Sequence, residues 1–163
     1  MLQKTARPQI TWHSDIPEHG PVAPCDRRLL RQALTNLLQN AADAIAMRPK
    51  VVASSQDVYD TGGRPGAAEP EGCITVAVAA SGNEVRITVT DDGVGLPQED
   101  RGRLTEPYVT HKPKGTGLGL AIVKKIMEDH GGRLMLDDRP GGPGAVATLV
   151  LPLSVLDRNS HGA

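Results

Sequence analysis

Residues 26–47, DRRLLRQALTNLLQNAADAIAM, carry the strongest helical pattern in the sequence. Their apolar side chains recur at spacings of three and four residues, which places them on one face of an α-helix. Asp26 stands directly before the pattern, where a carboxylate can accept hydrogen bonds from the first backbone N–H groups of a helix. The segment therefore predicts a long amphipathic helix whose apolar face carries Leu30, Ala33, Leu34, Leu37, Ala41 and Ile45.

The same segment has a polar face. Asn36, Asn40 and Asp43 fall within an arc of about 60° on the side away from the leucines. Asn is a poor helix former, so two of them one turn apart call for an explanation. An amide oxygen is a good neutral ligand for Mg²⁺ or partner for phosphate. A solvated polar face is the ordinary alternative, and the motif alone does not decide between the two.

Strands are predicted on both sides of this helix in the sequence. Residues 9–14 alternate polar and apolar side chains and end shortly before Pro17, which is typical of a short strand. Residues 74–78 and 85–89 alternate in the same way, and the Ser81-Gly82-Asn83 connection between them is typical of a hairpin. We therefore expect these two runs to be antiparallel neighbours.

A second helix and a final strand pair follow. Residues 118–130 carry apolar side chains at helical spacing, and the pattern stops at Gly131-Gly132. Residues 133–137 and 145–151 are predicted to be strands. Because strands and helices do not alternate strictly, we expect an α+β fold: a two-layer sandwich in which a mixed, mostly antiparallel sheet is covered on one face by helices.

The length of 163 residues, with 39% hydrophobic and 23% charged residues, fits one globular domain. Its core is expected over residues 9–153, followed by a tail over 154–163. Residues 49–72 are dense in Gly, Pro, Ser, Asp and Glu without a sustained period, which predicts a mobile insertion. Cys25 and Cys73 have no CxxC spacing and are expected to be free thiols in a reducing compartment.

The charge pattern argues against several classes of partner. A net charge of −1 provides no field that would hold nucleic acid or an anionic membrane. No apolar run approaches the roughly 20 residues of a membrane helix, and the first residues do not resemble a secretory signal. We therefore expect a cytoplasmic domain that has no membrane contact of its own and binds no nucleic acid.

A second polar motif, Asp91-Asp92-Gly93-Val94-Gly95-Leu96, follows a predicted strand. A carboxylate fixed at a strand end can accept a hydrogen bond from an exocyclic amine. The glycines allow the backbone to turn sharply and to approach a planar ring closely. A simple turn is the alternative, since Asp-Gly is among the commonest turn signals.

A third motif, Gly115-Thr116-Gly117-Leu118-Gly119-Leu120, leads into the second predicted helix. Glycines leave backbone N–H groups accessible, and the helix N-terminus adds the positive end of its dipole, so the motif is suited to phosphate. It has neither the GxGxxG spacing of a dinucleotide fold nor the Gly-Lys-Ser/Thr of a Walker A loop. A flexible hinge is the alternative, but three cations just upstream suit an anionic ligand: His111, Lys112 and Lys114.

The three motifs together suggest a ligand with an amine-bearing ring, a metal and several phosphates, which is Mg-ATP. They resemble the N, G1 and G2 boxes of the catalytic ATP-binding domain of sensor histidine kinases, a resemblance that spans residues 26 to about 153. Residues 106–112 are similar to the F box of nitrogen-regulation-type sensor kinases, with Tyr108 where Phe is usual. The implied fold is the Bergerat sandwich shared with gyrase, Hsp90 and MutL.

The resemblance also implies roles for particular residues. Asp91 would receive the adenine amino group, Asn40 would bind Mg²⁺, and Asn36 would lie near the phosphates. Residues 97–114 would form the ATP lid. The implied site, with Asn36 and Asn40 as its catalytic residues, comprises Asn36, Asn40, Asp43, Asp91, Gly93, Gly95, Tyr108, Lys112, Lys114, Gly115, Thr116, Gly117, Leu118 and Gly119.

The residue at position 36 bears on the reaction. In gyrase-like and Hsp90-like members a Glu one helical turn before the metal-binding Asn activates water. Here that position is Asn36, and an amide has no useful basicity near neutral pH, so hydrolysis should be slow. This favours a kinase that donates the γ-phosphoryl group to a histidine on a separate dimerisation domain, with a response regulator as a further partner of the full kinase.

The five histidines do not provide that acceptor. None stands in the sequence context of a phosphoacceptor, and His130 is expected to be a cation at a helix C-terminus. The chain is therefore expected to be a monomeric catalytic domain. Two alternatives remain: a hydrolytic ATPase of the same fold, and a non-enzymatic module that senses ATP and regulates a partner.

Overall fold

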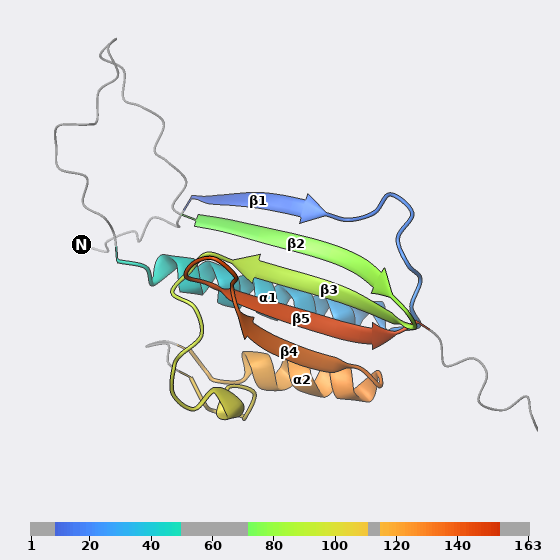
Figure 1. Ribbon diagram of the computed structural model, residues 1–163. Helices are drawn as coiled ribbons and strands as arrows, with labels where there is room; N and C mark the ends of the chain where they lie inside the picture. Colours follow the sequence, from blue (N-terminus) through green and yellow to red (C-terminus); the bar gives the residue numbers. More distant parts are fainter. Residues whose placement is uncertain (1–8, 50–71, 111–114, 154–163) are drawn as a thin grey trace, which may run out of the picture.

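The computed structural model describes residues 9–49, 72–110 and 115–153, which form one five-stranded sheet with both α-helices on one face (Figure 1). The sheet order is β1-β2-β3-β5-β4; β1 is parallel to β2, and the other neighbours are antiparallel. This confirms the predicted α+β sandwich. The elements are β1 (Ile10–Asp15), α1 (Arg27–Ala46), β2 (Gly72–Ser81), β3 (Glu84–Asp91), the 3₁₀ helix η1 (Arg101–Arg103), α2 (Gly119–Asp129), β4 (Arg133–Asp138) and β5 (Ala145–Pro152).

Helix α1 begins where the sequence predicted. The Asp26 carboxylate accepts hydrogen bonds from the backbone N–H groups of Arg28 and Leu29, at 2.8 and 3.1 Å. These bonds satisfy two of the donors that the first turn of a helix leaves unpaired. The fully buried positions of the helix are Ala33, Leu37, Ala41 and Ile45.

The core lies between the sheet and the two helices. Ile74 of β2, Val89 of β3 and Leu149 of β5 form one buried cluster with Val123 and Met127 of α2 and with the buried face of α1. Each such side chain contributes about 1.5–3 kcal/mol by leaving water. The packed layers hold the ends of β3, α1 and α2 in fixed positions relative to one another.

His130 joins the two helices. Its Nδ1 lies 2.6 Å from the Ile126 carbonyl oxygen, and its Nε2 accepts the Asp26 N–H at 3.0 Å. The ring therefore contacts the last turn of α2 through Nδ1 and the N-cap of α1 through Nε2. The expected position at the C-terminus of α2 is confirmed, because the ring bonds a carbonyl in the last turn of that helix, and its positive charge stays a prediction.

Other differences lie in the connections. Gly72 begins β2 and pairs with Ile10, so this last residue of the predicted insertion belongs to the sheet instead; residues 50–71 and the predicted tail over 154–163 lie outside the described residues. The sequence did not predict η1 or the parallel pairing of β1. No helix within the described ranges has the length and apolar character needed to cross a membrane.

Candidate functional site

A cavity of about 730 Å³ opens between α1, the end of β3 and the segment that leads into α2. One part of its wall is apolar and includes Leu37, Val89, Leu136 and Ala147. The polar part brings together residues from all three sequence motifs, which lie far apart in the chain. These are Asn36, Asn40, Asp43, Asp91, Gly95, Gly115, Thr116, Gly117 and Gly119.

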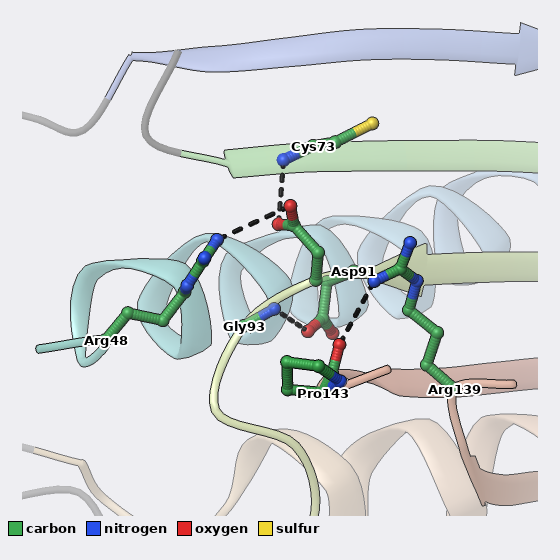
Figure 2. Close-up of polar contacts among 7 residues, drawn as sticks. Arg48, Cys73, Asp91, Gly93, Arg139 and Pro143 are labelled. Atoms are coloured by element: carbon green, nitrogen blue, oxygen red, sulfur yellow. Dashed lines mark hydrogen bonds and ion pairs between the residues drawn. The ribbon is translucent and has the colours of Figure 1, made fainter. Parts of the chain in front are cut away.

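Asp91 is the buried carboxylate of this wall, with 6% of its surface exposed. As the last residue of β3, it accepts the Gly93 N–H through Oδ1 at 2.8 Å (Figure 2). Burial raises the pKa of Asp91, and the neighbouring Asp92 charge adds to the rise. The N–H groups of Gly93 and Ala145 and the charge of Arg139 lower it. The wall therefore contains a carboxylate that has lost much of its water and still has capacity to accept hydrogen bonds.

The β4–β5 hairpin closes around this strand end. A Cβ atom added at Gly144, whose φ is +130°, would lie 2.0 Å from the Asp91 carbonyl oxygen. The Arg139 N–H donates to the Gly144 carbonyl at 3.0 Å, and its guanidinium donates to the Pro143 carbonyl at 3.2 Å (Figure 2). Only glycine fits at position 144, because any side chain would displace the backbone that carries Asp91.

The opposite end of the cavity faces the N-terminus of α2. Asn36 Nδ2 donates to the Gly119 carbonyl at 3.3 Å, which ties the polar face of α1 to the first turn of α2. The N-cap residue Leu118 offers no capping side chain, and the first turn has no acidic residue. The N–H groups and the positive dipole end of α2 are therefore suited to an anion from solution.

Gly117 joins this end to the preceding segment. Its φ is +72°, and an added Cβ would lie 2.6 Å from the Tyr108 carbonyl carbon. The Gly117 carbonyl accepts the Tyr108 N–H at 2.9 Å. Tyr108 itself has a φ of +65° and is 79% exposed, so its ring lies on the surface beside the cavity.

The remaining site residues expected from the sequence do not line the cavity or lie outside the described ranges. Gly93 lies under the wall, where its N–H supports Asp91, and Leu118 is the N-cap of α2. His111, Lys112 and Lys114 fall in the undescribed residues 111–114.

Sequence reasoning missed several polar contacts around the cavity. The Arg101 guanidinium makes two hydrogen bonds, of 2.9 and 2.8 Å, to the Asp138 carboxylate, and its Nε donates to the Pro97 carbonyl. This pair ties η1 to the end of β4. Arg48 and Asp92 form a second pair at 3.4 Å beside Asp91. Long-range pairs of exposed charges leave no periodic or turn signal in a sequence, so nothing in the pattern could have found them.

Comparison with known proteins assigns the family. The family model of histidine kinase-, DNA gyrase B- and HSP90-like ATPases matches residues 25–155. Nitrogen regulation protein NtrY of Azorhizobium caulinodans is 45% identical over 150 residues, which cover 92% of this chain and 17% of NtrY. Sensor histidine kinase ZraS of Escherichia coli is 33% identical over 142 residues, 87% of this chain and 25% of ZraS.

A solved structure agrees with these relatives. The mycobacterial sensor histidine kinase MprB superposes with a TM-score of 0.66 at 28% identity, covering 88% of this chain and 82% of the MprB chain. The chain spans at most a quarter of the length of NtrY and ZraS, so it corresponds to one part of each. Since the family model matches most of the chain and includes every described residue of the cavity wall, the chain belongs to the histidine kinase-, DNA gyrase B- and HSP90-like ATPase family.

Proposed function

We propose that this chain is the catalytic domain that gives a two-component sensor histidine kinase its phosphoryl donor. It binds Mg-ATP in the cavity and presents the γ-phosphoryl group to a histidine on a separate dimerisation domain. One observation carries the proposal: the wall of the cavity brings together a buried carboxylate, two amides and a glycine-rich helix N-terminus. The response regulator is the partner of the full kinase, and the isolated chain is a monomer.

In this proposal Asp91 accepts a hydrogen bond from the adenine amino group. The apolar wall that includes Val89 and Ala147 takes the ring, since a purine buries two flat apolar faces. A buried carboxylate discriminates well, because a base that lacks the amino group leaves it without its donor. The glycine-rich end takes the phosphates on the N-terminus of α2.

The metal would be held by Asn40 together with the phosphates. An amide oxygen is a hard, neutral ligand that suits Mg²⁺. Asn40 lines the cavity, and a Cβ atom added at Gly119 would lie 3.9 Å from its side-chain amide. When bound, the ion would neutralise charge on the transferring phosphoryl group. Asn36, bonded to the Gly119 carbonyl, would keep the phosphate end of the cavity in place without activating water.

The test of the function is phosphotransfer in trans. The purified chain is mixed with the dimerisation domain of a nitrogen-regulation-type kinase and Mg-ATP, and acid-labile phosphohistidine is measured. Transfer of phosphate supports the proposal. ATP binding without any transfer to supplied acceptor domains would favour a regulatory module instead.

Asn40→Ala tests the metal assignment. Phosphotransfer should fall by more than nucleotide affinity does, because the phosphates and water still hold the ion in the ground state. Asn83→Ala, in the turn at the other end of β2 and β3, is the matched control and should leave both quantities unchanged. Wild-type transfer rates in Asn40→Ala would remove Asn40 from the metal site.

A further inference from the structure

Asp92 follows Asp91 in the chain but makes different contacts. Its Oδ1 accepts the Cys73 N–H at 2.8 Å, and its Oδ2 lies 3.4 Å from Arg48 Nη1. The Asp92 N–H also donates to the Cys73 carbonyl at 3.3 Å. One residue thus joins the end of β3 to the start of β2 and to the end of α1, where Arg48 lies.

These contacts continue the β2–β3 ladder past its last pair. The ladder ends at Ile74 and Asp91, and Asp92 pairs with Cys73 through both its backbone and its side chain. Beyond Asp92 the chain turns, and the Val94 N–H donates to the Ala44 carbonyl of α1 at 3.1 Å. The turn is therefore held on the β2 side by Asp92 and on the α1 side by Val94.

The position of the Asp91 carboxylate depends on this turn. The Gly93 N–H that supports Asp91 Oδ1 comes from the residue after Asp92. If the Asp92 contacts were lost, the peptide that bears this N–H could rotate, and the Asp91 side chain would lose a fixed partner. Small displacements matter here, since a hydrogen bond weakens steeply as its geometry departs from linear.

The two contacts of Asp92 differ in strength. The bond to the Cys73 N–H is short and partly buried. The Arg48 pair is longer, with 40% of the Arg48 side chain and 25% of the Asp92 side chain exposed, so salt and water screen it. An amide oxygen can replace the first contact but not the second. The Cys73 bond should therefore determine the geometry.

From this arrangement we propose that Asp92 is a positioning residue for adenine recognition. Through its bond to the Cys73 N–H it holds the turn after β3 so that Asp91 meets the adenine amino group. The proposal rests on the proposed function, because it requires the adenine to bind at Asp91.

The experiment compares two nucleotides in calorimetry: ATP and purine riboside triphosphate, which lacks the amino group. Asp92→Ala should weaken ATP binding about tenfold, the loss expected when one well-formed hydrogen bond is compromised. It should change the affinity for the purine nucleotide by less than about twofold, because that ligand makes no bond to Asp91. A general loss of folding would weaken both ligands alike, so the ratio isolates the positioning role.

Two further variants divide the contacts of Asp92. Asp92→Asn should keep nearly wild-type affinity for ATP, since its amide oxygen still accepts the Cys73 N–H, and Arg48→Ala should do the same. Asp15→Ala, at the exposed end of β1, is the matched control for loss of an aspartate at a strand end. If Asp92→Ala does not fold, Asp92→Gly carries the same expectation, because glycine also lacks an acceptor for the Cys73 N–H yet suits a turn.

A double-mutant cycle separates this proposal from the function on which it rests. In an Asp91→Asn background, Asp92→Ala should have no further effect on ATP affinity. Equal weakening of both nucleotides by Asp92→Ala, no weakening of either, or an undiminished effect in that background would overturn the positioning role. If Asp91→Asn does not favour the purine nucleotide over ATP relative to wild type, the adenine assignment itself fails, whatever Asp92 does.

Discussion

At the scale of single residues, the site places one carboxylate where its charge is costly. Asp91 is buried, and the elevated pKa shows that the N–H groups around it do not fully replace the water it has lost. A neutral side chain at this position would avoid the penalty of burying a charge. In the proposed function the adenine amino group would supply the missing donor, so ligand binding would offset the desolvation penalty of Asp91.

The desolvation penalty of the ionised Asp91 carboxylate predicts that the stability of the fold depends on pH. A carboxyl group whose folded pKa lies above its ordinary value of 3.8 destabilises the folded state when ionised, and the penalty disappears as the pH falls through the raised pKa. Asp91→Asn removes that titration. Without nucleotide, the variant should have a higher Tm than the wild-type chain at pH 7, and the difference should shrink as the pH falls towards 4.

Thermal unfolding of both proteins over this pH range is the measurement. Other carboxyl groups, such as Asp26 and Glu84, have lowered pKa values and lose stabilisation in acid, but they titrate in both proteins and cancel in the difference. A Tm difference that is constant with pH would show that Asp91 carries no such penalty.

At the scale of elements, the β4–β5 hairpin supports the strand end. Gly144→Ala and Gly141→Ala form a matched pair, because both glycines have positive φ, +130° and +80°, but only the first crowds Asp91. Nothing lies within 4 Å of a Cβ at Gly141. Both variants should lose about 1 kcal/mol for the backbone conformation. Gly144→Ala should lose about 1–3 kcal/mol more and should also weaken ATP binding, as measured by denaturant unfolding and calorimetry.

Equal stability losses in the two glycine variants, with unchanged ATP affinity, would show that the hairpin can move away from Asp91 without consequence. Contacts elsewhere in the strand would then hold the Asp91 carboxylate in position.

The pair between Arg101 and Asp138 predicts local rather than global stabilisation. The two side chains are 36% and 58% exposed, so their contribution to unfolding is screened by water. Arg101→Ala should speed amide exchange at Arg103 and Leu104, whose N–H groups hold η1, with little change in Tm. Arg101→Lys should not restore protection, because an ammonium cannot make the paired contacts of a guanidinium.

The control for Arg101 is Arg103→Ala. Its partner Glu106 lies three residues along the same segment, so the loss of this pair frees no contact with the sheet. If both alanine variants speed exchange to the same extent, the tie to β4 does not hold η1.

These elements show what a sequence can and cannot predict. Helix α1 was predicted with its N-cap, because the Asp26 carboxylate acts within three residues of its own position. The contact between Asp26 and His130 spans 104 residues and depends on the packing of α1 against α2, so it left no local signal. The parallel pairing of β1 with β2 joins Ile10 to Gly72, far along the chain, so it too left no local signal.

The candidate site was predictable to a similar depth. Residue types and spacing marked the three motifs, since helix geometry and turn chemistry are local, and the structure gathers residues of all three around one cavity. The contacts of Asp92 with Cys73 and Arg48 depend on how strand and helix ends meet in space. The ring of Tyr108 could not be placed either, because its orientation follows from a backbone bond to Gly117.

At the scale of the whole molecule, the chain supplies a nucleotide site and, in this proposal, neither a water-activating base nor a phosphoacceptor. A kinase benefits when its nucleotide site lacks both groups, because ATP is then not hydrolysed before the acceptor histidine arrives. The purified chain should therefore bind ATP and release phosphate only very slowly, at a rate that Asp91→Asn reduces further by weakening nucleotide binding.

Substitution of Asn36 tests whether the lack of a general base keeps ATP hydrolysis slow. Asn36→Glu places a carboxylate one helical turn before Asn40, and a positioned general base typically contributes about 10²–10⁴-fold to a rate. Asn36→Gln is the matched control, since it has the same length without basicity, and both variants lose the Asn36 bond to Gly119 in its present form. Phosphate release measured over hours should rise in Asn36→Glu alone. Rapid release by the wild-type chain, abolished by Asp91→Asn so that contamination is excluded, would instead identify a hydrolytic ATPase, because the water would then be activated without a carboxylate at position 36.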